Sequence, residues 1–108
     1  MGEFVTFRRW RLKADATEDQ VILLVREEIV PAYARLSNRV TLGLARVVGT
    51  SSFLATQEWD TRTAHDEAVN GASYTEWFDS YQHALSHWHA LLELEDEWEA
   101  ERLVDPAG

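Results

Sequence analysis

The stretch from Phe53 to Val69, FLATQEWDTRTAHDEAV, constrains the fold most strongly. Its first half alternates as a strand does, because successive side chains of a strand point to opposite faces. Thr61 or Thr63 can then cap a helix. The pattern predicts a buried strand that ends at a Trp and runs directly into a helix. One strand face would carry Phe53, Ala55, Gln57 and Trp59, and the other Leu54, Thr56, Glu58 and Asp60.

The N-terminal third predicts a strand followed by a helix. Phe4 to Lys13 has the β-branched and aromatic content of a strand. Thr17 with Gln20 fits a capping box, and the apolar face of the helix that it opens continues to Leu36. Pro31 lies inside this pattern and is expected to kink or end the helix, because proline has no backbone N–H.

Arg39 to Gly49 alternates as a second strand with unusually small side chains on one face. Small side chains let another layer approach closely. Thr50 to Ser52 form a short link to the strand that begins at Phe53, so these two strands are expected to be antiparallel neighbours. The small-residue face consists of Thr41, Gly43, Ala45 and Val47.

A long aromatic helix is expected after Asn70 and Gly71. Ser73 with Glu76 fits a second capping box at its start. Its apolar residues recur at spacings of three and four, and they can serve as core, as the lining of a cavity, or as both. The apolar residues are Tyr74, Trp77, Phe78, Tyr81, Leu85, Trp88 and Leu92.

The last segment, Leu92 to Val104, carries two conflicting signals. A period of two predicts a strand, whereas its Glu and Ala content favours a helix. We favour the strand, because pattern outranks propensity when the two conflict. On that strand Leu92, Leu94, Asp96, Trp98 and Ala100 would share one face, with glutamates on the other.

The resulting order is strand, helix, strand, strand, helix, strand, an α+β class with the ferredoxin-like βαββαβ arrangement. We expect one domain over residues 1–108, with an antiparallel sheet and helices on one face. The charge distribution agrees with this order. Residues 1–54 hold 8 basic and 6 acidic residues, and residues 55–108 hold 2 and 13. The acidic last strand would lie beside the first strand, which carries Arg9, Arg11 and Lys13.

Composition excludes several classes of function. The net charge of −9 argues against a nucleic-acid partner. There is no cysteine, so thiol chemistry and disulfides are excluded. No apolar run approaches the roughly 18 residues of a membrane span, and no signal peptide is evident. No membrane association and a cytoplasmic location are therefore expected.

The strand-ending Glu58-Trp59-Asp60, followed by the helix Thr61 to Val69, resembles the antibiotic-biosynthesis-monooxygenase-like family. The resemblance implies a dimeric α+β barrel in which the sheets of two copies face each other. It also implies a cavity between sheet and helices for a hydrophobic aromatic or polyphenolic small molecule. The implied activity is a monooxygenase reaction with no cofactor. A non-enzymatic ligand-binding or structural dimer is the alternative.

A homodimer is also expected from the residues themselves. Both faces of the sheet are too apolar for a single layer of helices to cover. The face without helices would carry Val5, Phe7 and Leu54 together with the small residues of the second strand.

The resemblance also implies roles for individual residues. In family members that oxidise polycyclic phenols, the Trp matching Trp59 helps to fill the cleft. A Tyr six positions later contacts the substrate, and His65 occupies that place here. Imidazole accepts protons near neutral pH, so His65 is the candidate catalytic base, with an ordinary exposed helix residue as the alternative reading. The remaining candidate cleft residues are Tyr74, Trp77, Phe78, Tyr81, Arg8 and Arg46.

Arg8 and Arg46 each lie on the mostly apolar face of a strand. A buried guanidinium needs an anionic partner. We expect each arginine to pair with Glu28 or Glu58, and the other interpretation is contact with an acidic ligand.

His83 and His87 have a spacing that is common among metal ligands. At helical register both lie opposite the apolar stripe, and no third ligand is evident nearby in the sequence. No metal and no haem are therefore expected. The alternative is the haem-degrading branch of the same superfamily, which uses an Asn, a Trp and a His. Trp77 with His87 or His83 could stand for the last two, but Trp10 takes the place of the Asn.

Overall fold

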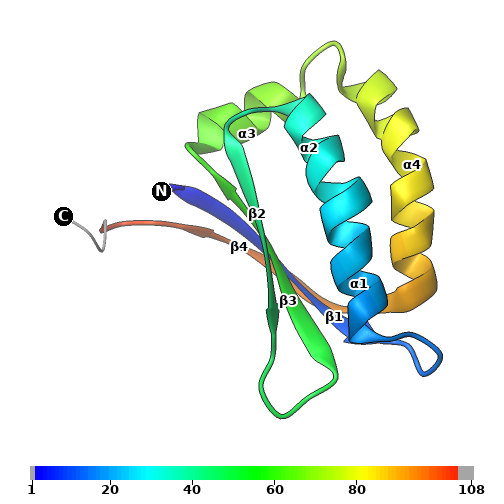
Figure 1. Cartoon of the computed structure of the whole chain (residues 1–108). Coiled ribbons are helices and arrows are strands. Elements are labelled where there is room, and N and C mark those ends of the chain that lie inside the picture. Colours follow the sequence, from blue (N-terminus) through cyan, green and yellow to red (C-terminus); the bar gives the residue numbers. More distant parts are fainter. Residues whose placement is uncertain (1, 105–108) are drawn as a thin grey trace.

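A computed structural model describes residues 2–104 and contains one four-stranded antiparallel sheet (Figure 1). The strands lie in the order β2-β3-β1-β4. They are β1 (Phe4–Leu12), β2 (Val40–Arg46), β3 (Ser52–Trp59) and β4 (Leu92–Glu101). The α+β, ferredoxin-like class is confirmed, and Leu92 to Glu101 is a strand.

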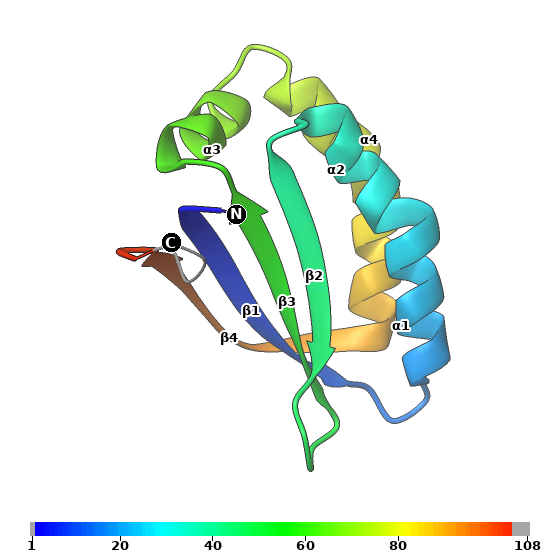
Figure 2. The same cartoon turned by 60° about the vertical axis from the view of Figure 1, so that its left-hand side comes forward.

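The helices cover one face of this sheet. The first helix consists of α1 (Glu18–Leu24), a π-helical segment (Val25–Ile29) and α2 (Val30–Leu36). It runs alongside the long α4 (Tyr74–Leu91), and both views place this pair on the same side of the sheet (Figures 1 and 2). The short α3 (Arg62–Val69) lies at the end of the sheet where β3 finishes. Within the described residues, no helix is both long and apolar enough to cross a bilayer.

Two of the predicted helix caps are present and one is wrong. Thr17 and Gln20 form both hydrogen bonds of a capping box, and Thr61 caps α3 by accepting from the Ala64 amide at 3.0 Å. Ser73 makes no side-chain cap bond, because its backbone is helical instead of extended. An extended residue at this position is what brings the hydroxyl to the free amides.

Pro31 does not end its helix. It lies in the first turn of α2, immediately after the π-helical segment, and the chain remains helical to Leu36. The Val30 amide bonds to the Val25 carbonyl, five residues back. A proline in a helix removes one amide donor, and its ring crowds the turn before it. The wider π turn lies in that preceding turn and makes room for the ring.

A β-bulge changes which face the end of β4 presents. Leu94 pairs with Trp10 and Asp96 pairs with Arg9, so Glu95 is an extra residue without a partner of its own. The predicted strict alternation is therefore wrong beyond Leu94. Trp98 lies on the face without helices, where its ring stacks on Phe7 at 5.3 Å between centroids.

The charge pairing between the first and last strands is confirmed. Arg11 contacts Glu93 at 2.5 Å, and Arg9 contacts Glu95 at 3.4 Å. Lys13 departs from the pattern by donating to the His89 carbonyl at 2.6 Å. Most of β4 is exposed, so its glutamates carry no burial cost.

The main core lies between the sheet and the helices. Trp10 of β1 packs edge-on against Trp88 of α4, with ring centroids 5.5 Å apart. A smaller cluster of Phe4, Trp59 and Ala64 anchors α3 to the end of the sheet. This second cluster fixes one end of the cavity described next.

Candidate ligand cleft

A cavity of about 860 Å³ lies between the sheet and the helices. Its walls come from all four strands, from α2 and α3, and from α4. The volume falls in the range of about 300–1,000 Å³ that is typical of small-molecule sites. The cavity is the candidate ligand cleft of this fold.

The aromatic stripe of α4 forms both core and cleft wall. Trp77, Tyr81 and Trp88 are buried, whereas Phe78 is 39% exposed. Trp77 stacks on Tyr81 at 4.9 Å, and its indole nitrogen donates to the Ala32 carbonyl at 2.7 Å. These contacts hold the indole rigidly. All five predicted aromatic residues, including Tyr74, line the cleft.

A few polar groups interrupt this apolar lining. Gln57 of β3 donates from Nε2 to the Tyr33 hydroxyl at 3.0 Å, and its Oε1 accepts from the Trp59 indole at 3.3 Å. Thr6 of β1 is buried, and its hydroxyl has no hydrogen-bond partner among the described residues. Buried polar atoms are normally paired, so this hydroxyl has an unused capacity for a hydrogen bond. The sequence did not single out Thr6, Tyr33 or Gln57.

Burial raises the pKa of the two tyrosines in the cleft. Desolvation is the main cause for both Tyr33 and Tyr81, and it outweighs the opposing effect of the Arg8 charge. A raised pKa keeps both phenols protonated at neutral pH. These tyrosines can donate hydrogen bonds to a ligand but are poor proton acceptors.

His65 lies beside Trp59 at the α3 end of the cleft. Trp59 is 1% exposed, and the His65 ring stands edge-on to it with centroids 5.2 Å apart. Phe4 covers His65 from another side at 5.0 Å. The Nδ1 atom of His65 lies 2.9 Å from an Asp66 carboxylate oxygen. If Nδ1 carries the proton toward Asp66, Nε2 is left as the acceptor.

The expected partners of the two arginines are wrong. Arg8 lines the cleft and pairs with Glu97 of β4 at 3.1 Å, because the bulge turns Glu97 to the helix side. Arg46 lies at the end of β2, outside the cleft lining, and forms two hydrogen bonds to Glu18 at 2.5 and 2.7 Å.

The two glutamates that were expected to pair with these arginines contact other residues. Glu58 pairs with Arg102 at 3.5 Å, and Glu28 contacts His87. Both assignments depend on which segments the fold brings together.

One histidine of α4, His89, lies in the cleft lining with Trp77, and the other two do not. His83 and His87 are exposed and do not line the cleft, as their helical register predicts. Trp77 and Trp10 both line the cleft wall. The described residues therefore do not bring together the Trp and His of the haem-degrading alternative.

Comparison with known proteins gives matches of structure only. No protein-family model and no curated protein sequence matches the chain. The structure has the fold of the antibiotic-biosynthesis-monooxygenase-like proteins.

Three solved structures illustrate the likeness. SnoaB, a cofactor-independent oxygenase from Streptomyces nogalater, aligns with a TM-score of 0.67 and 15% identity over 98% of this chain and 99% of its own. A Chloroflexus aurantiacus protein, provisionally described as an antibiotic biosynthesis monooxygenase, aligns with a TM-score of 0.61 and 14% identity over 94% of both chains. Atu4242 from Agrobacterium tumefaciens is a nipsnap family protein of unknown function. It aligns with a TM-score of 0.68 and 12% identity over 95% of this chain and 97% of its own.

Proposed function

We propose that the cleft binds a hydrophobic phenolic or polyphenolic aromatic molecule and that the protein oxygenates it without a cofactor. The observation that carries this proposal is a cavity of about 860 Å³ walled by aromatic rings, with His65 beside Trp59 at one end. SnoaB, which has the same fold, is a cofactor-independent oxygenase. That likeness supports the class of reaction and leaves the substrate open.

The lining favours a flat, largely apolar ligand with a few oxygen substituents. Rigid aromatic walls bury a fused ring system at little entropic cost. The Thr6 hydroxyl has no partner among the described residues, and the protonated Tyr81 phenol lies on the opposite wall. These groups would bind phenol and carbonyl oxygens at the ring edges.

His65 would act as the general base. A phenol must lose its proton before its ring becomes electron-rich enough to reduce oxygen. Oxidation of a ring CH₂ to a carbonyl consumes one O₂ and releases one water, so the substrate itself supplies the electrons. The Tyr33 and Tyr81 phenols are poorly suited to take the proton, because burial raises the pKa of both. The described lining contains two histidines, His65 and His89, and His65 is the candidate base because it lies beside Trp59 at the α3 end of the cleft.

The test is oxygen consumption by the purified protein with a hydroxyanthrone as substrate. We expect saturable oxygen uptake, with the corresponding quinone as product, that continues after treatment with a metal chelator. The absence of uptake with any hydroxyanthrone or hydroxynaphthalene would contradict the enzymatic proposal. Quenching of Trp fluorescence by the same compounds, without turnover, would identify a binding protein.

Ligand binding without catalysis is the second candidate. It is favoured by the way the polar groups of the cleft engage one another. Gln57 is committed to Tyr33 and Trp59, and Arg8 is committed to Glu97. A lining of this kind can serve a cleft that binds a ligand and leaves it unchanged.

We also propose that two copies associate through the sheet face without helices. The Phe7–Trp98 stack lies on this face, and Trp98 is 43% exposed. Gly43 and Ala45 of β2 are exposed and small. A second sheet could approach closely there, and covering the exposed apolar surface would favour association.

A further inference from the structure

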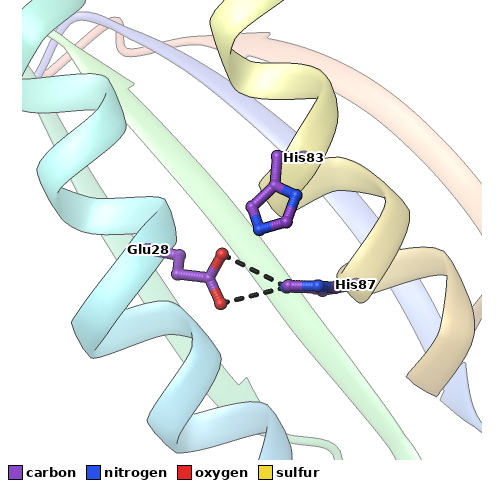
Figure 3. A group of neighbouring side chains, drawn as sticks. All are labelled: Glu28, His83 and His87. Carbon is purple, nitrogen blue, oxygen red and sulfur yellow. Dashed lines mark hydrogen bonds and ion pairs between the residues drawn. The ribbon is translucent and has the colours of Figure 1, made fainter.

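A histidine pair and a glutamate meet on the helical surface that faces away from the sheet. His83 and His87 come from successive turns of α4, and Glu28 comes from the neighbouring π-helical segment (Figure 3). Potential ligand atoms of the three side chains lie within 4.8 Å of one another. Figure 3 shows the Glu28 carboxylate directed at His87 across the gap between the helices, with His83 one turn away on α4.

We propose that Glu28, His83 and His87 bind one divalent transition-metal ion, with zinc as the best fit. Two imidazoles and a carboxylate form a three-ligand set that zinc sites use, with water in the fourth position. Such a set disfavours Mg²⁺ and Ca²⁺, which take oxygen ligands almost exclusively. The proposed site is independent of the cleft, because neither histidine contributes to the cleft lining.

The distances already approach those of a metal site. The His87 Nδ1 atom lies 3.1 and 3.2 Å from the two Glu28 carboxylate oxygens. Bonds of about 2.0–2.2 Å at a tetrahedral ion place two ligand atoms roughly 3.3–3.6 Å apart. The His83 and His87 rings have centroids 4.4 Å apart and an interplanar angle of 63°. His83 is exposed, so its side chain is free to turn toward the same point.

The π-helical segment explains how Glu28 reaches this position. Glu28 follows the buried Val21 by seven residues, so an unbroken α-helix would place it beneath Val21 on the apolar face. The wider turn changes this register, and Ile29 becomes the buried residue while Glu28 stays half-buried. Single π turns are frequent at functional sites.

The surroundings leave room for an ion and attract cations. A groove of about 300 Å³ runs beside the cluster and is lined in part by Glu27, Glu28 and His87. The net charge of the chain is −9, which raises the local concentration of divalent cations. A bound ion would join the first helix to α4 on the outer side of the helical layer.

The test is calorimetric titration of the tag-free, chelator-treated chain with ZnCl₂, with MgCl₂ as the comparison. We expect one Zn²⁺ per chain and no comparable binding of Mg²⁺. Glu28→Gln and His83→Ala should each weaken zinc binding at least about tenfold, which corresponds to about 1.4 kcal/mol. The matched control Glu27→Gln removes the same charge one residue away and should change the affinity by less than about threefold.

Two further readouts keep the test independent of the stability of any one variant. Co²⁺ added to the wild-type chain should give the intense visible absorption of a tetrahedral ion, and Glu28→Gln should abolish it. Zinc should raise the Tm of the wild type and of Glu27→Gln, because an ion that binds only the folded chain stabilises it. An absence of zinc binding in the wild type, or equal affinity in all four proteins, would overturn the proposal.

Discussion

His65 is held by three neighbours with different effects. The rings of Phe4 and Trp59 bury much of the imidazole, and its side chain is 22% exposed. The Asp66 carboxylate lies against Nδ1. A fixed ring with one nitrogen engaged presents the other to its surroundings, which is the geometry that a general base requires.

The His65→Ala substitution tests this role. General-base assistance is typically worth about 10²–10⁴-fold, so the variant should lose at least about tenfold in turnover of a hydroxyanthrone. Its far-ultraviolet circular dichroism should match that of the wild type. Glu67→Ala on the exposed side of α3 is the control and should keep full turnover. Equal rates in all three proteins would rule out His65 as the base.

Trp59 is a residue of the core as well as of the cleft. It is 1% exposed and packs with Phe4 and Ala64. Truncation of a buried Trp costs roughly 3–5 kcal/mol, so Trp59→Ala should lower the urea midpoint strongly and weaken ligand binding. Leu23→Ala is the comparison, because Leu23 is 56% exposed and its loss should cost little. A small effect at Trp59 would mean that the smaller core cluster does not anchor α3.

The buried phenol of Tyr81 should make the free energy of unfolding depend on pH in alkaline solution. Burial raises its pKa in the folded chain above the unfolded value of about 10. Such a group contributes stability that is complete below pH 10 and is lost as the pH rises through the folded pKa. Tyr81→Phe removes the ionising group, so its free energy of unfolding should fall less steeply above pH 10 than that of the wild type. Urea titrations at pH 8 and pH 11 measure the difference, and identical slopes would contradict the assignment.

At the scale of elements, β4 shows how one residue sets the orientation of the strand. Glu95 is the bulged residue, and its carboxylate takes a hydrogen bond from the Ser52 hydroxyl and faces Arg9. These contacts lower the pKa of Glu95, with the Ser52 hydrogen bond as the main cause. A bulge held in this way turns Trp98 toward Phe7 and Glu97 toward Arg8.

Deleting single residues of β4 tests the bulge. Deletion of Glu95 leaves every downstream residue opposite its present partner, so the fold and the Phe7–Trp98 stack should survive with a modest loss of stability. Deletion of Glu97 shifts Trp98 by one position and moves its side chain to the other face. The second variant should lose more stability and the near-ultraviolet signal of the stacked rings. If urea titrations show the Glu95 deletion to be the less stable variant, the bulge does not set the register between β1 and β4.

At the scale of the whole molecule, the helices leave one face of the sheet without a second layer (Figure 2). In the proposed dimer, a second copy of the chain packs against this face. Its centre would be the small side chains of β2 and the Phe7–Trp98 stack.

The Ala45→Asp substitution tests the association. It places a charge on the exposed small-residue face of β2, where burial against a second sheet would leave it unpaired. Sedimentation equilibrium at micromolar concentration should give twice the chain mass for the wild type and a shift to the monomer for Ala45→Asp. Leu23→Asp, on the outer side of the first helix, should remain a dimer. A monomeric wild type would contradict the proposal.

The sequence by itself determined the order of the elements and the faces of most of them. Strand alternation from Phe4, the capping box at Thr17 and the aromatic period of α4 are local patterns, because each depends on residues a few positions apart. The pairing of the basic first strand with the acidic last strand was also readable, since complementary charge acts along whole segments. The same helical period predicted Trp77 and Tyr81 as core, as cavity lining or as both, and both residues are buried and line the cavity.

Only the tertiary structure decided which distant side chains meet. The bulge at Glu95 depends on the register between β1 and β4, and that register places Glu97 where it pairs with Arg8. Glu28 meets His87 across 59 residues because a π turn changes the face that it occupies. Gln57 of β3 and Tyr33 of α2 meet because their side chains reach each other across the cleft. Contacts of this kind depend on the distances between packed elements, and a periodicity within one element carries no information about them.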